Sequence, residues 1–331
     1  TTEIYTLSLH DALPICRLIF EQARTLAASV GGELDADGDL ADEVANLVEA
    51  PQALLGGFDP AFLSLPSEVL VAVMKKHQRY FPVRKASGEL LPHFIAVRNG
   101  GAEGLDSIRA GNEHVLRARF ADAEFFLRKD QAQPLAFYRN QLGRLTFHAR
   151  LGSMLDKAER LDSLTPHIAA DVGLTGSETK TAQRAGSLCK ADLATAMVAE
   201  MTSLQGVMGR IYAQRSGEPP AVAQAIYEHY LPRFSGDSLP ESPAGAVVGL
   251  ADRVDTLAGL FVVDTKPTGT RDPFALRRTA LGLIEILVAR RIEIEIGDWF
   301  DQAAGRPPFD LSADRRSDCL LFLRERQGTA W

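Results

Sequence analysis

Four cations lie close together between residues 266 and 278, in a segment whose composition predicts a loop joining two helices. Pro267 and Gly269 interrupt the helical pattern, and Asp272-Pro273 predicts an N-cap followed by proline at the first helical position. Arginines in an opening turn oppose the helix dipole, so their presence there suggests an anion-binding role. The candidates to bind a phosphate at this helix N-terminus are Lys266, Arg271, Arg277 and Arg278.

An ordinary solvated loop is the alternative for this segment. Asp264, Asp272 and Glu285 could pair with its cations, and the spacing alone favours this alternative over a phosphate site. Only the positions of the side chains in the folded protein can decide between the two.

A second group of candidates lies at the end of a predicted helix. Lys75, Lys76 and Arg79 are followed by Tyr80, and cations beside an aromatic ring suit RNA, whose phosphates attract the charge and whose bases stack on the ring. A solvated helix end explains such a run more often. Arg233, in an aromatic-rich stretch around His229, is the last RNA-binding candidate.

The sequence contains no motif for nucleotide chemistry. It has neither G-x-x-x-x-G-K-[ST] nor G-x-G-x-x-G, and nucleophile-elbow and metalloprotease motifs are absent. Its three cysteines are far apart, which predicts neither a disulfide framework nor a zinc site. The net charge of −7 means that a nucleic acid must bind at a local basic patch. We therefore expect no catalytic residue, cofactor or metal in this chain, and no apolar run approaches the roughly 20 residues that a bilayer crossing needs.

The periodicities predict an α+β protein whose first half mixes helices and strands. Residues 1–15 fit the pattern that follows poorly and resemble a translated sequencing adaptor, so they are excluded from the fold prediction. The expected elements are helices at 17–30, 39–48 and 65–80, an extended segment at 51–58, and a hairpin of 81–83 with 90–97.

The second half is predicted to be helical. From Asn112, the expected N-cap of a helix, the helical period dominates. A helix at 246–261 has one apolar stripe, and Asp252, Arg253 and Asp255 are expected at the margin of that stripe. Beyond Gly297 the pattern weakens, and a last short helix is expected at 318–326.

A succession of short motifs resembles the β subunit of bacterial glycyl-tRNA synthetase. These motifs occur in order between Arg17 and Arg291. They are Asn46-Leu-Val-Glu-Ala-Pro, Leu54-Leu-Gly-Gly-Phe-Asp, Leu65-Pro-Ser-Glu-Val-Leu, Met74-Lys-Lys-His-Gln-Arg-Tyr-Phe-Pro-Val, Phe94-Ile-Ala-Val-Arg-Asn, Gly111-Asn-Glu-His-Val-Leu-Arg-Ala-Arg, Leu151-Gly-Ser-Met-Leu-Asp-Lys, Lys190-Ala-Asp-Leu, Leu204-Gln-Gly-Val-Met-Gly-Arg, Glu228-His-Tyr-Leu-Pro-Arg-Phe, Leu250-Ala-Asp-Arg-Val-Asp-Thr and Pro267-Thr-Gly-Thr-Arg-Asp-Pro-Phe-Ala-Leu-Arg-Arg.

The resemblance implies a subunit of a cytoplasmic α2β2 ligase that attaches glycine to tRNA(Gly). In this family the α subunit uses ATP and Mg, while the β subunit engages tRNA and is required for activity; neither a membrane nor DNA is a partner. The β subunit begins with a mixed domain similar to part of phenylalanyl-tRNA synthetase, followed by a helical HD-like domain. These domains correspond to 16–135 and 136–296, and 297–331 would be a linker and the start of a truncated anticodon-binding domain.

The HD-like resemblance also brings an alternative function, that of a metal-dependent HD phosphohydrolase. Such an enzyme holds its metal with histidine and aspartate side chains. Here Lys190 and Asp192 take the place of the His-Asp pair, and Asp252 that of the last aspartate. A protonated lysine cannot ligate a metal, so the resemblance implies a scaffold without metal chemistry, with Asp192 and Asp252 in salt bridges. A stand-alone RNA-binding or structural module is the third hypothesis.

Overall fold

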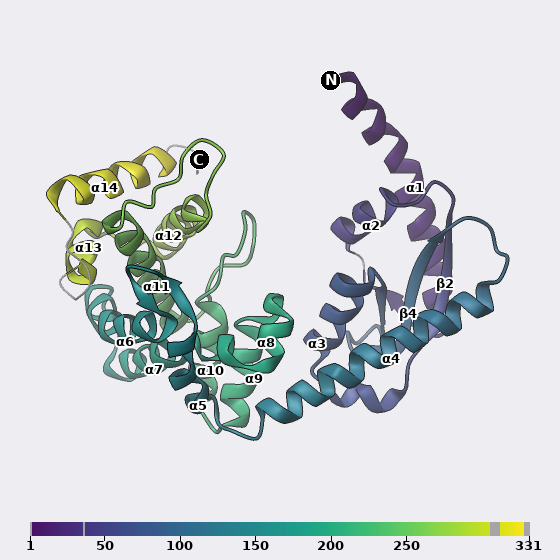
Figure 1. Ribbon diagram of the computed structural model, residues 1–331, viewed down its shortest axis with the longest axis horizontal. Helices are drawn as coiled ribbons and strands as arrows, with labels where there is room; N and C mark the ends of the chain where they lie inside the picture. Colours follow the sequence, from purple (N-terminus) through teal and green to yellow (C-terminus); the bar gives the residue numbers. More distant parts are fainter. Residues whose placement is uncertain (1, 36, 305–311, 328–331) are drawn as a thin grey trace. The chain divides into compact units, whose positions relative to one another are not determined.

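The computed structural model describes residues 2–35, 37–304 and 312–327 and divides the chain into two compact units (Figure 1). The division falls between Arg128 and Lys129. The first unit contains a four-stranded sheet covered by helices, and the second is almost entirely helical. The α+β fold class is therefore confirmed.

The first unit comprises the elements up to the long helix that contains the division. They are α1 (Thr2–Ser29), β1 (Glu33–Leu34), α2 (Gly38–Ala45), β2 (Pro51–Gly57), η1 (Pro60–Ser64), α3 (Ser67–Ala72), η2 (Val73–His77), β3 (Phe81–Arg84), β4 (Leu90–Asn99) and α4 (Leu105–Asp130).

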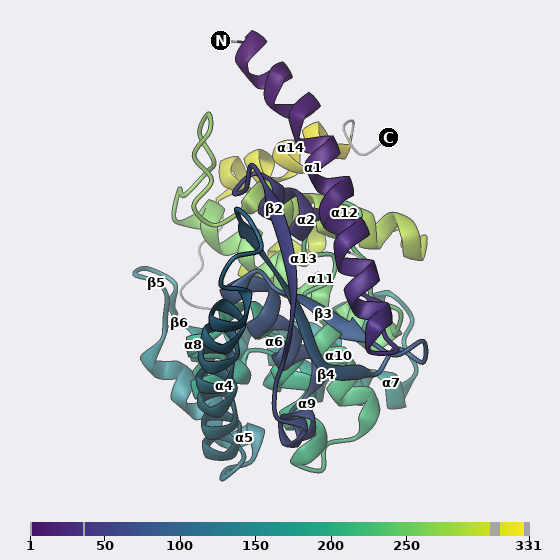
Figure 2. The same ribbon diagram turned by 90° about the vertical axis from the view of Figure 1, so that its right-hand side faces the viewer.

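The sheet has the order β1-β3-β4-β2, and every neighbouring pair is antiparallel (Figure 2). The expected hairpin is confirmed as β3 and β4, and the expected extended segment as β2. Alternate residues point to opposite faces. Phe81 and Ile95 are buried in the core that α1 and α2 form on one face, whereas Phe94 stacks on Tyr80 with ring centroids 4.7 Å apart.

The free edge of β2 is covered by side chains instead of another strand. The Gln22 amide bonds to Pro51 O and Ala53 N, at 3.1 and 2.7 Å. On α4, Arg109 Nε donates to Leu55 O at 2.8 Å, and Glu113 Oε1 accepts from Gly57 N at 2.8 Å. Because an open edge invites pairing with another chain, these bonds protect the sheet from self-association.

Three expectations for this unit need correction. The helix expected at 65–80 is shorter, because α3 passes into the π-helical turn η2, and Arg79 then adopts a left-handed φ of 55°. Asn112 is not an N-cap, since α4 already begins at Leu105. Residues 2–15, excluded from the prediction, belong to α1; their adaptor origin stays a prediction, because a helical backbone does not test it.

The second unit contains short helical turns between longer helices. Its elements are α5 (Leu135–Gln141), η3 (Leu142–Arg144), β5 (Thr146–His148), β6 (Gly152–Ser153), α6 (Met154–Asp171), α7 (Gly176–Leu188), η4 (Ala191–Ala194), α8 (Ala196–Glu200), η5 (Thr202–Leu204), α9 (Val207–Arg215), α10 (Pro220–Glu228), α11 (Pro243–Val262), α12 (Leu276–Arg290), α13 (Ile296–Ala304) and α14 (Ala313–Gln327).

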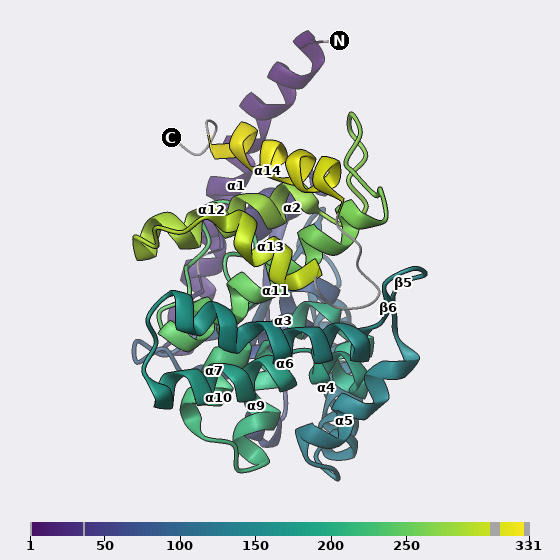
Figure 3. The same ribbon diagram turned by 90° about the vertical axis from the view of Figure 1, so that its left-hand side faces the viewer.

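Helix α11 is the centre of this unit, and α6, α7, α10, α12, α13 and α14 all pack against it (Figure 3). A helix surrounded in this way is buried on every side. Arg253 and Asp255 are 7% and 1% exposed. The expectation that they lie at the margin of an apolar stripe is therefore wrong.

The described part of 297–331 forms helices that pack on the same unit. Trp299 of α13 is fully buried and donates to Asp171 Oδ2 at 2.8 Å. The last helix, α14, begins at Ala313, five residues before its expected start, and contacts α11 and α12. None of the described helices combines the length and the hydrophobicity that a bilayer crossing requires.

Candidate functional site

The loop between α11 and α12 is fixed by its own backbone. Thr268 and Arg271 exchange backbone hydrogen bonds of 3.0 and 2.8 Å, and Gly269 between them adopts a φ of 51°. Asp272 accepts from the backbone N–H groups of Leu276 and Arg277, at 2.8 and 3.0 Å. The predicted N-cap position is therefore wrong, because Ala275 is the N-cap, α12 begins three residues later than predicted and Pro273 remains in the loop. Asp272 nevertheless satisfies the first N–H groups of the helix from the loop.

Two of the four candidate cations of this loop are engaged in holding it. Lys266 pairs with Asp318 of α14 and lies 3.8 Å from Asp264. Arg277 donates to Gly269 O at 2.6 Å.

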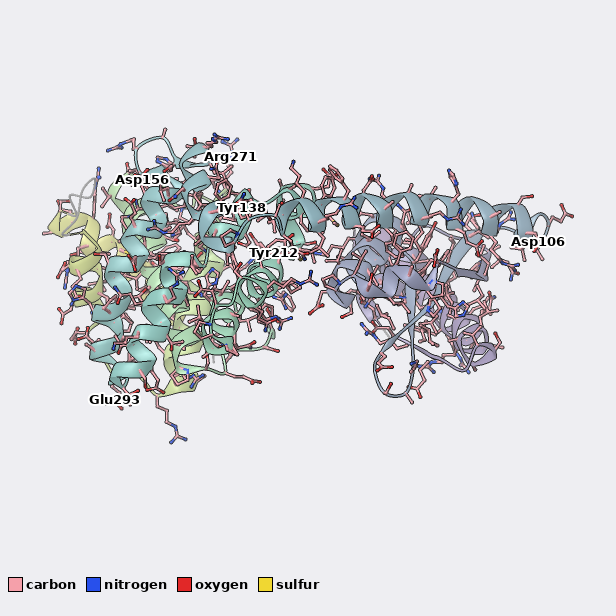
Figure 4. All side chains as sticks on the ribbon, turned by 90° about the horizontal axis from the view of Figure 1, so that it is seen from below. Asp106, Tyr138, Asp156, Tyr212, Arg271 and Glu293 are labelled. Carbon is pink, nitrogen blue, oxygen red and sulfur yellow. The ribbon has the colours of Figure 1, made fainter. Side chains whose placement is uncertain are left out.

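The other two cations face the solvent. Arg271 and Arg278 are exposed, and within the described ranges neither side chain has a hydrogen bond or an ion pair. Figure 4 shows Arg271 at the surface of the helical unit. Lys266 and Arg277 therefore stabilise the loop, whereas Arg271 and Arg278 are accessible to an anion.

Helix α14 braces this loop and adds a residue that the sequence analysis missed. Phe322 makes an edge contact with Phe261 of α11 at 5.3 Å, and the Arg326 guanidinium lies 3.4 Å above the Phe322 ring. Burial and the nearby Arg277 charge lower the pKa of Arg326. No sequence signal connects Arg326 to a loop some 50 residues earlier, because only the packing of α14 brings them together.

The basic segment of the first unit is mostly neutralised. Lys75 lies 3.3 and 3.1 Å from carboxylate oxygens of Asp35 and Asp37, and Arg79 lies 2.6 Å from Glu43. Tyr80 is buried, so its ring is no platform for a base. Lys76 is the candidate that stays exposed and without an ion pair in the described part of this unit.

Arg233 is also paired. Its guanidinium makes two bonds to Asp237, at 2.8 and 3.1 Å, and nearly half of its side chain remains exposed. An RNA contact of Arg233 stays a prediction.

A buried network of charges lies where the HD-like resemblance placed a degenerate metal site. Lys190 Nζ is 2.8 Å from Asp252 Oδ2, and Lys157 Nζ is 2.9 Å from Asp252 Oδ1. Lys157 also bonds Asp255, which accepts from Arg160 Nε at 2.6 Å. Burial alone would raise the pKa of Asp252, but the two ammonium groups hold this pKa well below its usual range. The expected salt bridge of Asp252 is present.

Asp192 does not share this arrangement, so its expected salt bridge is wrong. Its Oδ2 accepts from the backbone N–H groups of Gly206 and Gly209, at 2.6 and 3.1 Å, at the start of α9. Burial raises the pKa of Asp192 to about 6, despite these bonds. Backbone amides, not a cation, therefore hold this carboxylate.

His229 and Arg253 complete the network. His229 Nε2 lies 2.9 Å from Lys190 Nζ, and burial together with that ammonium lowers the pKa of His229 well below its usual value. Arg253 donates to backbone carbonyls from Gly249 and from each residue of 229–232. This arginine satisfies a turn that would otherwise leave buried acceptors unpaired.

The network does not present a set of metal ligands. Among the described residues, no group of three or more His, Cys, Asp or Glu side chains is arranged to hold a metal ion. The position facing Asp252 is taken by two lysines, which are cations themselves.

Comparison with known proteins identifies the family. The family model for the glycyl-tRNA synthetase beta subunit matches residues 16–330. The glycine–tRNA ligase beta subunit of Desulforamulus reducens is 49% identical over 279 residues, 84% of this chain and 40% of that protein. The one from Syntrophomonas wolfei is 46% identical over 314 residues, 94% of this chain and 45% of that protein. The chain thus spans less than half the length of these relatives, and it belongs to the glycyl-tRNA synthetase beta subunit family.

Proposed function

We propose that this chain is the tRNA-engaging part of a glycine–tRNA ligase β subunit. It would assemble with α subunits into an α2β2 enzyme in the cytoplasm and support ATP- and Mg-dependent glycylation of tRNA(Gly), with ATP and Mg used by the α subunit. Family membership over 16–330 supports this proposal. The residues that would bind the tRNA lie in this chain, and no residue of it would take part in covalent chemistry.

The exposure of Arg271 and Arg278 on a braced loop is the observation that favours this loop as an RNA contact. Both guanidinium groups are free of ion pairs within the described ranges, whereas Lys266 and Arg277 hold the loop in shape. Because the backbone that carries these two cations is already fixed, only their side chains lose entropy when they bind a phosphate. Phosphate contacts of this kind set affinity and its dependence on salt.

The HD phosphohydrolase alternative has less support. A divalent cation at Asp252 would have to displace Lys157 and Lys190 from a buried carboxylate. The ammonium groups already supply the positive charge that a metal would bring, so the geometry favours a structural network.

Binding of tRNA(Gly) tests the proposal. We expect the complex of this chain with its α subunit to bind the tRNA, and Arg271→Ala with Arg278→Ala to reduce the slope of log K against log salt by roughly 0.7–0.9 for each lost phosphate contact. Lys180→Ala, which removes an exposed cation of α7, is the matched control. An unchanged slope would remove the loop from the interface, and failure of the unmodified complex to bind or glycylate tRNA would overturn the proposed function.

A further inference from the structure

A pocket of about 350 Å³ lies between α12 and the segment that joins α10 to α11. Leu239, Ile284 and Val288 give it a mainly apolar lining, and Asp237 and Glu285 supply carboxylates. A flat, largely apolar group with N–H donors at one edge would match this combination.

Side chains fix the segment between α10 and α11 that forms one wall of the pocket. Arg290 donates to Pro240 O at 2.6 Å and also to Glu241 O. Arg253 of α11 donates to the carbonyls of Leu231 and Pro232, at 2.8 and 3.1 Å. The joining segment is therefore held at each end, and a pocket that exists before binding costs less to fill.

The charges around the pocket distinguish its two carboxylates. Asp237 is neutralised by Arg233. Glu285 has no hydrogen bond or ion pair within 2–35, 37–304 and 312–327, so its oxygens can accept from a ligand, although the charge of the buried Arg253 acts on it. Arg290 provides a positive charge beside the lining residues, whereas the charge of Arg233 is offset by Asp237.

One face of α12 connects this pocket to the basic loop. Arg278 and Glu285 are seven residues apart, which places them on the same helix face about 10 Å apart along the axis. Val288 follows one turn later, and it is 47% exposed. An exposed aromatic side chain, Phe234, lies just before the pocket segment and under the Arg233 guanidinium at 5.7 Å.

We propose that the pocket takes an unpaired guanine of the bound RNA, with Glu285 accepting from the N1–H and N2–H groups of the base. The strand would run along α12, so that its phosphates reach Arg278. Single-stranded RNA is recognised by such base-edge bonds and by aromatic stacking, for which Phe234 is placed. The exposed Arg278 on the same face of α12, which has no partner among the described residues, favours RNA over an apolar protein segment. This inference rests on the proposed tRNA-binding function.

Short RNAs test whether the pocket recognises guanine, and two of them differ only by one amino group. The probes are fluorescently labelled heptaribonucleotides of uridine with a central guanosine, inosine or uridine, titrated into the full chain at low salt. Inosine lacks the N2 amino group, so we expect the unmodified chain to bind the guanosine probe about tenfold more tightly than the inosine probe, as a hydrogen bond to a charged group requires. Glu285→Gln keeps only one acceptor oxygen and no charge, so it should reduce this preference for guanosine.

Glu293→Gln is the control, because Glu293 is an exposed carboxylate that follows α12 and does not line the pocket. Figure 4 shows it at the far lower edge of the helical unit in that view. We expect it to retain the preference for guanosine. Val288→Asp should weaken binding of all three probes, since it puts a charge on the apolar lining, and circular dichroism would verify its fold.

Two outcomes would overturn the inference. Equal binding of guanosine and inosine probes by the unmodified chain would exclude recognition of the base edge. Val288→Asp weakening α-subunit assembly but not RNA binding would make the pocket a protein interface. In both cases loss of tRNA binding in the Arg271 and Arg278 variant would leave the proposed function intact, so failure of the two proposals can be told apart.

Discussion

Replacing Lys190 by methionine tests whether Asp252 depends on two internal ammonium groups. Methionine is similarly long and uncharged, so it removes the charge with little change in packing. Lys190 Nζ lies 2.8 Å from Asp252 Oδ2. Removing one partner of a buried ion pair costs about 3–5 kcal/mol. Since Asp252 keeps Lys157 at 2.9 Å, we expect the free energy of unfolding at pH 8 to fall by about 3 kcal/mol, the lower end of that range.

The destabilisation should shrink at acidic pH because of His229. In the native protein, burial and Lys190 hold the pKa of His229 well below 6.5. Below pH 6.5 the unfolded chain therefore binds a proton at His229 that the folded protein does not bind, and the free energy of unfolding falls. Without Lys190, an imidazolium can face Asp252 and its pKa rises. At pH 5.5 the gap between the two proteins should therefore narrow by up to about 1.4 kcal/mol.

Urea unfolding followed by tryptophan fluorescence measures this effect, since Trp299 is fully buried in the second unit. Lys180→Met on the surface of α7 should change stability by no more than about 0.5 kcal/mol. Adding Asp252→Asn to Lys190→Met should recover part of the loss, because the buried group that lost Lys190 is then neutral, while Lys157 keeps Asp255. A loss below about 1 kcal/mol at pH 8, or the same loss at both pH values, would refute the reasoning.

Three other substitutions test separate parts of the structure. Asp192→Asn keeps an acceptor for the amides of α9. Because burial raises the pKa of Asp192 to about 6, the native protein gains stability as the pH falls from about 6 towards 4, and the variant should lack this gain and be more stable at pH 8 by at most about 3 kcal/mol in urea unfolding. Gly206→Ala puts a Cβ 2.5 Å from Tyr230 at a φ of 78° and should lower the thermal midpoint more than Gly217→Ala, whose Cβ at a φ of 80° meets open space; equal shifts would mean that the contact is unimportant. Arg109→Ala with Glu113→Ala uncovers the edge of β2 and should cause concentration-dependent association in analytical ultracentrifugation, and a monomer at all concentrations would contradict the protective role.

Local patterns predicted much of the fold. The alternation of residues and the Ser87-Gly88 turn predicted the hairpin of β3 and β4. A hairpin depends on neighbours in sequence, which is why the sequence predicts it. The salt bridge expected of Asp252 came instead from the family resemblance, because its partner Lys190 is distant in sequence. Helix ends were less well predicted: α4 begins before Asn112, and the π-helical turn η2 ends the helix expected at 65–80.

Motifs, periodicity and charge are properties of the chain, so they predicted the family, the α+β class and the set of cations near residue 270. Which of these cations are available depends on the tertiary structure. Arg271 and Arg278 remain exposed, while Lys266 meets Asp318 on α14. It also decided that Asp252 faces two lysines and that Asp192 faces backbone amides. Helices distant in sequence pack around a charged group and provide its partner. Burial then determines whether that group stays paired inside the protein or is accessible to a ligand.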